Sequence, residues 1–499
     1  MLTLGIDSGT QSTKTIVLDF ETGEILASAQ AAYGFIEGLP PGHLEQHPQT
    51  WLDAAALTVA KCLLQIGGRR EEVAAMGVSG QQHGMVALNS QDKPVRPAKL
   101  WCDTSTTDQC AQFEARFGGK KGLIDLAGNA ILPGYTAPKI LWLKQKEPAS
   151  YRATDCFLLP HDYLNLWLTG EKRMEYGDAS GTGLLDIRTR EWSRPLVDFI
   201  DPDLADLLPK PRTSQKAIGL LRETLRKEWG LAKSPIISAG GGDNMMAAIG
   251  TGNIAPGIVT ASLGTSGTLF SFAEAPVIDG KGEVAAFCDS TDRWLPLVCT
   301  MNVTIVTEQV RRLFGWDLPA LEKALLSAPA GCDGLLFLPY LQGERTPDLP
   351  NASGVYHGLN TANMQPAHMA RAAAEGATLG LAYGLNRFRE LGIQPAEIRL
   401  TGGGSNSAAW RQIAADVFGV PTVCLSSHEG AALGAAIQAG WSYLSANGNS
   451  VPLHEITARL VRLEESTRSQ PNAENVRLYP SLSEKHAGLT KALNDAGYL

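Results

Sequence analysis

The chain has 499 residues, 44% of them hydrophobic, so it can bury enough apolar surface for two or more domains of ordinary size. Its 43 basic and 51 acidic residues give a formal net charge of -8, so it has no global positive field to hold nucleic acid or an anionic membrane. The first residues are typical of a strand rather than a signal peptide, and no long apolar run follows, so we expect a soluble, cytoplasmic protein. The eight cysteines are scattered without a CxxC pair, which favours reduced thiols over a structural zinc site.

Two apolar, β-branched runs near the N-terminus, residues 2–7 and 13–18, flank the polar turn SGTQS. This pattern predicts a β-hairpin in which glycine supplies the turn. Asp7 ends the first strand, where a carboxylate can orient a divalent metal through its waters while the turn directs N–H groups and hydroxyls at phosphate oxygens. An ordinary hairpin at a sheet edge would have the same sequence, so one copy leaves both interpretations open.

Two segments in the first half of the chain have the composition of a site for a polyhydroxylated molecule. Such a site needs donors and acceptors for each hydroxyl and an apolar wall. Residues 79–84 (SGQQHG) and 100–106 (LWCDTST) together supply amide, imidazole, indole and carboxylate groups. A lone histidine is more often structural than functional, so His83 is a candidate only because of its neighbours.

The crossing between two halves of the chain is predicted near residues 231–252. There an apolar run of strand type meets three glycines, then Asp243, then a helical pattern of small residues. Asp243 could simply cap the helix. At a glycine-rich crossing, however, its carboxylate is well placed to accept the proton of a sugar hydroxyl that attacks a γ-phosphate.

The arrangement of strand, glycine–threonine turn and strand recurs in residues 257–272 (GIVTASL, GTSG, TLFSF). This recurrence indicates an internal repeat and two related halves, and two such turns can hold one polyphosphate. The chain has no G-x-x-x-x-G-K-[ST] sequence, which excludes a P-loop as the route to ATP.

A second glycine cluster, residues 402–406 (GGGSN), follows an apolar run and precedes a helical stretch over 410–418. The cluster could form the floor beneath an adenosine, or it could only allow tight packing of helix on strand. Residues 370–389 and 429–444 are rich in alanine with apolar residues at helical spacing, which predicts two core helices of the second half. The tail after Pro452 is charged and helical in places, and no function follows from it.

Taken together, these motifs resemble those of the FGGY carbohydrate kinases over essentially the whole chain, and within that family they are most similar to the xylulokinases. GIDSGTQSTK resembles the first phosphate motif, AGGGDN the catalytic-aspartate motif, SLGTSGT the second phosphate motif and TGGGSNSAAW the adenosine motif, in the family's order and spacing. GQQHG, WCDTSTTDQC and GYTAPKILWL look specifically like xylulokinase segments. Two positions depart from many bacterial relatives, because Ser105 stands where they carry arginine and Gln82 where they carry methionine. Both lie at the sugar, so they leave the exact pentulose open.

The resemblance implies an α/β fold of two ribonuclease H-like domains of the actin-like ATPase type, residues 1–245 and 246–499, with Mg-ATP and the sugar meeting in a cleft. It also implies ATP-dependent phosphorylation of a pentulose, with D-xylulose converted to D-xylulose 5-phosphate, Asp243 as the general base and Asp7 at Mg²⁺. The residues implied at the sugar are Gln82, His83, Asp103, Asp243 and Asn244. Those implied at ATP are Thr10, Ser12, Thr13, Lys14, Gly264, Thr265, Ser266, Gly403, Gly404 and Asn406.

Three alternatives share parts of this pattern. A kinase of the same family acting on ribulose, fuculose, gluconate or glycerol would differ only in the sugar pocket. An actin-like or heat-shock-like ATPase would not need the QQHG and WCDT segments, and a silent sugar-binding module would have no reason to keep both carboxylates. Epimers differ by one hydroxyl, so the preferred sugar stays open. The oligomeric state is open too, with a homodimer expected at the family level.

Overall fold

The computed structural model describes residues 1–427 and 429–499, which form two compact units. The first unit contains Met1–Ile254, Ala273–Leu295 and Glu429–Val461, and the second contains the remaining described residues. The boundary predicted between residues 245 and 246 falls inside helix α10 (Asp243–Gly250), and the chain first leaves the first unit after Ile254. The assignment of the two halves to two family domains stays a prediction.

The first unit is built on a mixed sheet with the strand order β13-β14-β5-β1-β2-β3, in which β15 also pairs with β5. Strands β1 and β2 form the predicted antiparallel hairpin, whereas β14, β15 and β1 all run parallel to β5. Almost every residue of β1 is buried, as expected for a strand covered on both faces. The strands are β1 (Leu2–Ser8), β2 (Ser12–Asp19), β3 (Ile25–Ala32), β5 (Val73–Gly80), β13 (Gly219–Leu220), β14 (Ile236–Ile237) and β15 (Gly241–Gly242).

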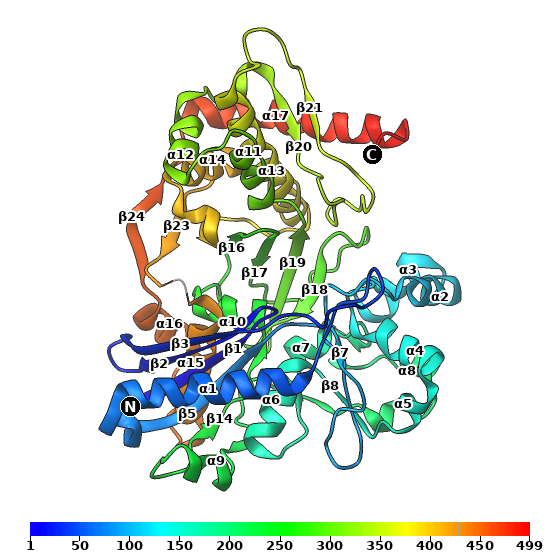
Figure 1. Ribbon diagram of the computed structural model, residues 1–499, viewed down its shortest axis with the longest axis vertical. Coiled ribbons are helices and arrows are strands. Elements are labelled where there is room, and N and C mark those ends of the chain that lie inside the picture. The colour runs from blue at the N-terminus through cyan, green and yellow to red at the C-terminus, as the bar shows by residue number, and fades with distance from the viewer. Residues whose placement is uncertain (428) are drawn as a thin grey trace. The chain divides into compact units, whose positions relative to one another are not determined.

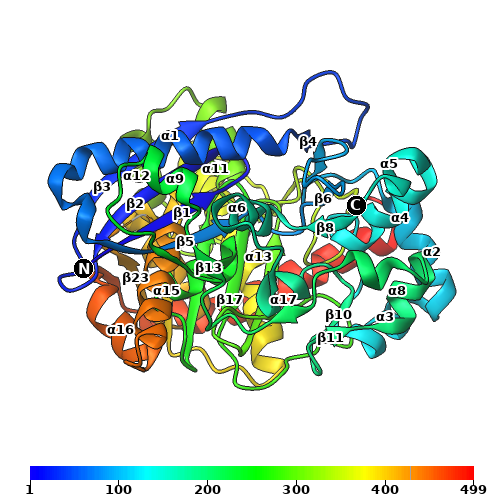
Figure 2. The same ribbon diagram turned by 90° about the horizontal axis from the view of Figure 1, so that it is seen from below.

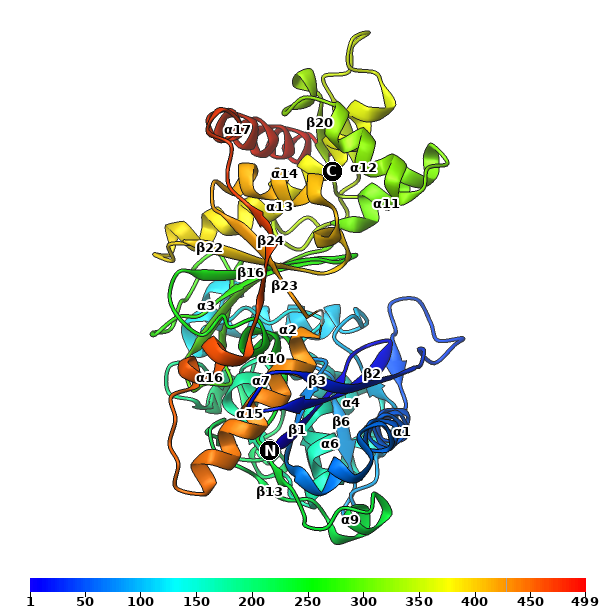
Figure 3. The same cartoon turned by 90° about the vertical axis from the view of Figure 1, so that its left-hand side faces the viewer.

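Helices α1 (Pro48–Ile66) and α15 (Gly430–Ala446) cover opposite faces of this sheet (Figure 3). The prediction that residues 429–444 form a core helix of the second half is therefore wrong in its placement, although the helix itself is confirmed. The reason is close packing through glycine. A Cβ atom at Gly5 would lie 1.9 Å from the carbonyl oxygen of Ala432, and one at Gly77 would lie 2.2 Å from that of Ala435. Two strands thus accept this helix only because they lack side chains there.

The rest of the first unit consists of further helices and short strands around this sheet. Helix α6 (Pro160–Thr169) lies beside β5 (Figure 2), and a separate hydrophobic core joins the helices that follow the second sugar segment. Those helices are α2 (Thr107–Phe117), α3 (Gly119–Ala127), α4 (Thr136–Lys146), α5 (Pro148–Arg152) and α8 (Arg194–Ile200). The other helices are α7 (Tyr176–Ser180), α9 (Glu223–Glu228) and α16 (Leu453–Leu460), and the short strands are β4 (Glu45–Gln46), β6 (Val86–Leu88), β7 (Ala98–Lys99), β8 (Cys156–Leu158), β9 (Met174–Glu175), β10 (Leu185–Asp186), β11 (Glu191–Trp192), β12 (Pro211–Arg212) and β18 (Ala285–Cys288).

The second sheet repeats the plan with the strand order β18-β19-β17-β16-β22-β23-β24. Strands β16 (Ile258–Leu263) and β17 (Gly267–Ser271) form the second predicted hairpin, and β22 (Glu397–Thr401) runs parallel to β16. The predicted helix over 370–389 is confirmed as α13 (Pro366–Glu390). It lies with α14 and α17 in the helical layers of this unit (Figure 1). The remaining elements are β19 (Trp294–Thr300), β20 (Leu336–Leu338), β21 (Val355–His357), β23 (Thr422–Leu425), β24 (Leu463–Ser469), α11 (Thr304–Leu313), α12 (Leu318–Ser327), α14 (Ala408–Phe418) and α17 (Ala473–Asp495).

Among the residues that the structure describes, no helix combines the length and the apolar character needed to cross a membrane.

Candidate active site

Three parallel strands of the first unit bring two predicted carboxylates to the same edge of the sheet. Strand β5 lies between β1 and β15, so that Ser79 is the register partner of Asp7 on one side and of Gly241 on the other. Helix α10 begins with Asp243 directly after β15. Because the carboxyl ends of parallel strands are where open α/β sheets bind their ligands, this edge is the candidate active site.

Asp7 is partly buried and has one side-chain hydrogen-bond donor nearby. Its Oδ1 accepts a hydrogen bond from Ser79 Oγ at 2.8 Å. Burial raises the pKa of Asp7 to about 6, while the bond from Ser79 and the charge of Lys14 act in the opposite direction. A nearby cation would lower this raised pKa and stabilise the ionised form of Asp7.

Asp243 occupies the first position of α10, and Gly242 takes the cap position that a purely structural interpretation would give to the aspartate. Burial, together with the negative charge of Asp7, raises the pKa of Asp243 to about 7. The Asn244 backbone N–H donates to Asp243 Oδ1 at 2.8 Å. A carboxylate whose pKa lies near neutrality is suited to accept a proton at physiological pH.

Gln82 links the first sugar segment to this carboxylate. Its Oε1 accepts a hydrogen bond from Asn244 Nδ2 at 2.9 Å, and the same amide lies 3.1 Å from Asp243 Oδ1. A Cβ atom at Gly242 would lie 2.6 Å from Gln82 Cγ, so the glycine is what lets the two segments meet. Gln82 Nε2 is buried and has no hydrogen-bond partner among the described residues, which leaves one donor for a ligand.

The turn of the first hairpin is tied to the second sugar segment. Trp101 Nε1 donates to Thr10 Oγ1 at 2.9 Å, and Gln46 Nε2 donates to the Thr10 carbonyl at 2.7 Å. Ser12 contacts the neighbouring strand β3 instead, because its hydroxyl accepts a hydrogen bond from Gln30 Nε2 at 2.8 Å. The structure therefore joins Thr10 to the tryptophan predicted as the apolar wall of a sugar site.

Thr13 and Lys14 point in different directions from strand β2. The Thr13 hydroxyl is buried within 3.1 Å of the Tyr33 hydroxyl, so it stabilises the turn from inside. Lys14 is the cross-strand partner of Asp7, and its Nζ lies 2.9 Å from Glu429 Oε2. Of these two predicted phosphate residues, only Lys14 is partly exposed.

Asp103 is fully buried and held by four donors. Its Oδ2 accepts from Lys99 Nζ at 2.8 Å and from the Leu44 N–H at 2.9 Å, and its Oδ1 accepts from the backbone and hydroxyl of Ser105 at 3.0 and 2.6 Å. Burial alone would raise the pKa of Asp103, but these donors hold it below its usual value. Asp103 is therefore an anion, and a direct contact with a sugar requires one donor to move.

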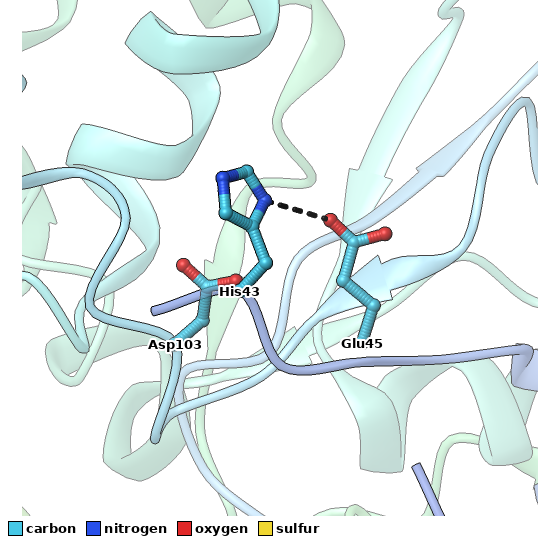
Figure 4. A group of neighbouring side chains, drawn as sticks. All are labelled: His43, Glu45 and Asp103. Atoms are coloured by element: carbon cyan, nitrogen blue, oxygen red, sulfur yellow. Dashed lines mark ion pairs between the residues drawn. The ribbon is translucent and has the colours of Figure 1, made fainter. Parts of the chain in front are cut away.

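Three groups of metal-ligand type, on His43, Glu45 and Asp103, converge within 4.8 Å of one another (Figure 4). The ammonium of Lys99 lies among them. Its Nζ is 2.8 Å from Asp103 Oδ2, 3.2 Å from Glu45 Oε1 and 3.2 Å from His43 Nδ1. The chain itself thus supplies the cation of this cluster, and the cluster fixes the position of the second sugar segment.

His83 has a left-handed backbone, with φ of 63°, which is unusual outside glycine. Its Nδ1 lies 2.7 Å from the Gly181 carbonyl oxygen, and its ring lies 4.8 Å from that of Tyr135. The buried Lys139 donates to the His83 carbonyl at 2.8 Å and to the Gly134 carbonyl at 2.6 Å. Burial lowers the pKa of Lys139 to about 7. This lysine holds the loop that carries Gln82 and His83.

The second unit brings its two predicted glycine motifs together. The turn at residues 264–266 follows β16 and the turn at 402–406 follows β22, and these strands are parallel neighbours in which Ser262 pairs with Thr401. A Cβ atom at Gly402 would lie 2.7 Å from the backbone carbon of Leu263, so the two turns touch. The side chains of Thr265 and Asn406 and the backbone of Gly403 are exposed, as a binding surface requires.

The predicted residues therefore fall into two sets, each assembled inside its own unit. Sequence reasoning did not assign the contacts of three residues of the first set: Ser79, which it placed in the first sugar segment, Lys99 and Lys139. Two of them left a signal, because Lys99 stands four residues before Asp103 and Lys139 interrupts an otherwise apolar helical segment, TAPKILWL. A charged residue at a buried helical position needs a partner, which is a reason to suspect a role.

Comparison with known proteins supports the family resemblance. The N-terminal domain of the FGGY family of carbohydrate kinases matches residues 2–250, and the C-terminal domain of that family matches residues 259–443. The chain is 40% identical over 489 residues to a xylulose kinase of Haemophilus influenzae, covering 97% of this chain and 98% of the relative. The structure of a ligand-bound xylulose kinase from Lactobacillus acidophilus superposes with a TM-score of 0.91 at 26% identity, covering 99% of this chain and 98% of the other.

A gluconate kinase from the same organism, Lactobacillus acidophilus, gives a TM-score of 0.90 at 27% identity, again covering 99% of this chain and 98% of the other. Similarity of the backbone thus does not separate these two sugars. The predicted α/β fold, two domains of the actin-like ATPase type, is confirmed by these structures. The chain belongs to the FGGY family of carbohydrate kinases.

Proposed function

We propose that this chain catalyses the ATP-dependent phosphorylation of a pentulose, with D-xylulose as the substrate and D-xylulose 5-phosphate as the product. The observation that carries the proposal is the contact of Asn244 Nδ2 with both Gln82 Oε1 and Asp243 Oδ1. The contact joins a carboxylate of raised pKa to one of the segments that look specifically like xylulokinase. The 40% identity to a xylulose kinase over nearly the full length supports the choice of sugar.

In the proposed reaction, the terminal hydroxyl of the sugar attacks the γ-phosphorus of ATP. A bond forms between that oxygen and phosphorus, the bond to the β-phosphate oxygen breaks, and ADP leaves. The hydroxyl proton passes to Asp243, whose pKa of about 7 allows it to take up the proton and later return it to water. The Asn244 N–H bond fixes the orientation of the accepting carboxylate.

ATP is the phosphate donor in this family. We assign the adenosine to Gly403, Gly404 and Asn406. A Cβ atom at Gly403 would meet no protein atom within 4 Å, which leaves room for a purine there, whereas the buried Gly404 packs against Leu263. Phosphate contacts are assigned to the glycine–threonine turns, with Gly264, Thr265 and Ser266 in one and Thr10, Ser12 and Lys14 in the other. The buried Thr13 supports the turn of the first hairpin through Tyr33 instead.

Asp7 is the proposed partner of Mg²⁺. A partly buried carboxyl group whose pKa is raised to about 6 by desolvation fits a divalent cation, because the cation would restore its ionised form. Such an ion, when bound, would neutralise charge on the phosphates during transfer. Asp7 would hold it directly or through its waters.

The sugar contacts proposed are Gln82 through its unpartnered Nε2, His83, Asn244 and Asp103. Asp103 already receives four hydrogen bonds. The smallest change that admits a sugar is the exchange of the Ser105 hydroxyl, 2.6 Å from Asp103 Oδ1, for a sugar hydroxyl. Ser105 also stands where many bacterial relatives carry arginine, which makes this exchange a determinant of sugar choice.

The decisive experiment is a measurement of ADP release with Mg-ATP against D-xylulose, L-xylulose, D- and L-ribulose, L-fuculose, glycerol and gluconate, with a control without sugar. We expect a strong preference for D-xylulose. Preference for gluconate would replace the substrate but keep the chemistry, whereas rapid turnover without sugar would favour the ATPase alternative. The homodimer stays a prediction, which light scattering of the purified protein would test.

A further inference from the structure

A cavity of about 370 Å³ opens in the first unit, and none of the proposed sugar or ATP residues lines it. Its volume lies in the range of small-molecule sites. Ala239, two residues before the first residue of the glycine strand β15, lines it, and Glu175 Oε1 lies 3.5 Å from where a Cβ atom of Gly241 would be. The cavity therefore borders the backbone that leads to Asp243.

Positive charge surrounds the opening of this cavity. Arg173, Arg212 and Lys216 all line it. The side chains of Arg212 and Lys216 are exposed and make no hydrogen bond or ion pair within the described part of the chain. Arg173 has only a surface contact with Glu171 at 3.2 Å, which contributes little. Exposed cations at the wall of a cavity are suited to an anion, and the planar arginine fork matches the geometry of a phosphate.

The inner wall of the cavity carries a buried acid. Asp162 is 1% exposed, and its Oδ2 accepts a hydrogen bond from the Leu159 N–H at 3.1 Å. Its Oδ1 lies 3.0 Å from His161 Nε2, but the direction of the ring does not make a hydrogen bond, so this oxygen has no hydrogen-bond partner. Burial raises the pKa of Asp162 to about 8 even though the charge of His161 acts in the opposite direction, so the group can present an O–H donor at neutral pH.

A second carboxyl group, that of Glu175, also lines the cavity, but its oxygens already accept hydrogen bonds from the protein. Its oxygens accept hydrogen bonds from the Gly177 N–H at 2.7 Å and from Ser214 Oγ at 2.5 Å, and it caps helix α7. Glu175 therefore shapes the wall, while Asp162 is the inner group with an oxygen that lies near His161 but accepts no hydrogen bond. A ligand that satisfies the cavity needs an anionic end and a hydroxyl-bearing end.

We propose that this cavity binds a small phosphorylated polyol, with the phosphate at Arg173, Arg212 and Lys216 and a hydroxyl at Asp162. A cationic ligand would be repelled by the three positive side chains. An apolar ligand would leave both the cations and Asp162 Oδ1 without partners. Free phosphate could use the cations alone, so the hydroxyl contact is what distinguishes a polyol phosphate from it.

Isothermal titration of the full chain tests this proposal with three probes: ribitol 5-phosphate, inorganic phosphate and ribitol. The informative variant is Arg212→Ala/Lys216→Ala, since both side chains are exposed and their removal leaves the fold intact. The matched control is Lys210→Ala, which removes an exposed lysine of the same segment that does not line the cavity. Comparing the variant with this control separates the cavity from binding at the kinase site.

The expected result is millimolar or tighter binding of ribitol 5-phosphate that weakens at least about tenfold in the double variant and is unchanged in the control, because two charge-assisted contacts are lost. Inorganic phosphate should bind more weakly than ribitol 5-phosphate, and ribitol more weakly still. Equal affinity of the double variant and the control would overturn the proposal. Equal affinity for inorganic phosphate and ribitol 5-phosphate would overturn the hydroxyl contact at Asp162.

Discussion

The ends of the two sheets are built from the same parts, a hairpin turn beside a parallel strand that runs into a glycine turn, yet they hold different groups. At the first, Asp7 and Asp243 lie on either side of β5, and desolvation raises the pKa of both. At the second, the turns at residues 264–266 and 402–406 contain only glycine, hydroxyl and amide side chains. Both sheets therefore offer equivalent backbone positions at their strand ends. Only the first sheet carries carboxylates there, so only it can accept a proton.

The two ends also differ in how their side chains are held. In the first unit, Gln82, Asn244 and Asp243 form a connected hydrogen-bond network. In the second unit, Thr265 and Asn406 are exposed. Substitutions in the first should therefore change the rate of chemistry, and those in the second should change nucleotide binding.

The strongest test of this difference is Asp243→Asn. We expect turnover to fall about 10²- to 10⁴-fold, because the general base is lost while the side chain keeps its size. ADP release at saturating sugar and ATP measures the effect. Asp155→Asn, at an aspartate whose side chain is 53% exposed, is the control and should keep full turnover. Near-normal turnover of Asp243→Asn would remove the chemical distinction between the two ends.

The pH dependence follows from the same carboxyl group. Its pKa in the folded chain is about 7 and its usual value is 3.8, so the native state holds this proton more tightly than the unfolded state does. The stability it contributes is complete below about pH 3.8 and is lost as the pH rises to about 7. Asp243→Asn should therefore raise Tm relative to the parent more at pH 8 than at pH 4. Activity of the parent should fall below about pH 7, and equal Tm differences at both pH values would contradict the assignment.

Asp7→Asn should act on the metal requirement. We expect the Mg²⁺ concentration for half-maximal turnover to rise about 10- to 100-fold, the usual range for a group that orients a metal or its waters. Titration with Mg²⁺ at fixed ATP and sugar measures it. Thr265→Ala is the comparison from the second unit, and it should leave the metal requirement as it is. A similar rise in both variants would show that the metal does not distinguish the two ends.

Lys139→Met should raise KM for the sugar roughly tenfold, because the His83 and Gly134 carbonyls lose a buried donor and the loop that carries Gln82 loosens. KM for ATP should stay constant. Lys139→Arg keeps a donor and a charge and should recover part of the loss if it folds. An equal rise in both KM values would mean that Lys139 supports the unit as a whole rather than the sugar loop.

The smallest expected effect concerns the glycines of the second unit. A Cβ atom at Gly403 meets no protein atom within 4 Å, so Gly403→Ala should keep its Tm and raise KM for ATP only a few-fold, on the order of 1 kcal/mol. Gly402→Ala should lower Tm, because its φ is 81° and its Cβ would strike Leu263. Unchanged KM for ATP in Gly403→Ala would remove this position from the adenosine site.

Much of the candidate site could be predicted because its motifs are local. In the sequence, strand patterns directly precede Asp7, Asp243 and the glycine turns. Parallel pairing of those strands then brings these residues to the same end of each sheet. The partner of Asp7, Ser79, could not be assigned, since it depends on the register between β1 and β5. Lys99 was missed for a similar reason, because its contacts with Glu45 and His43 join segments more than 50 residues apart.

By itself the amino-acid sequence determined both hairpins, helix α13 and the family, because hydrophobic periodicity and turn residues report local structure. Only the tertiary structure decided that α15 belongs to the first unit, since periodicity shows that a face is buried but not against what. The ionisation of Asp243 and Lys139 was also decided there. Their pKa values follow from desolvation and from charges brought close by the fold, and neither quantity is written in the neighbouring residues.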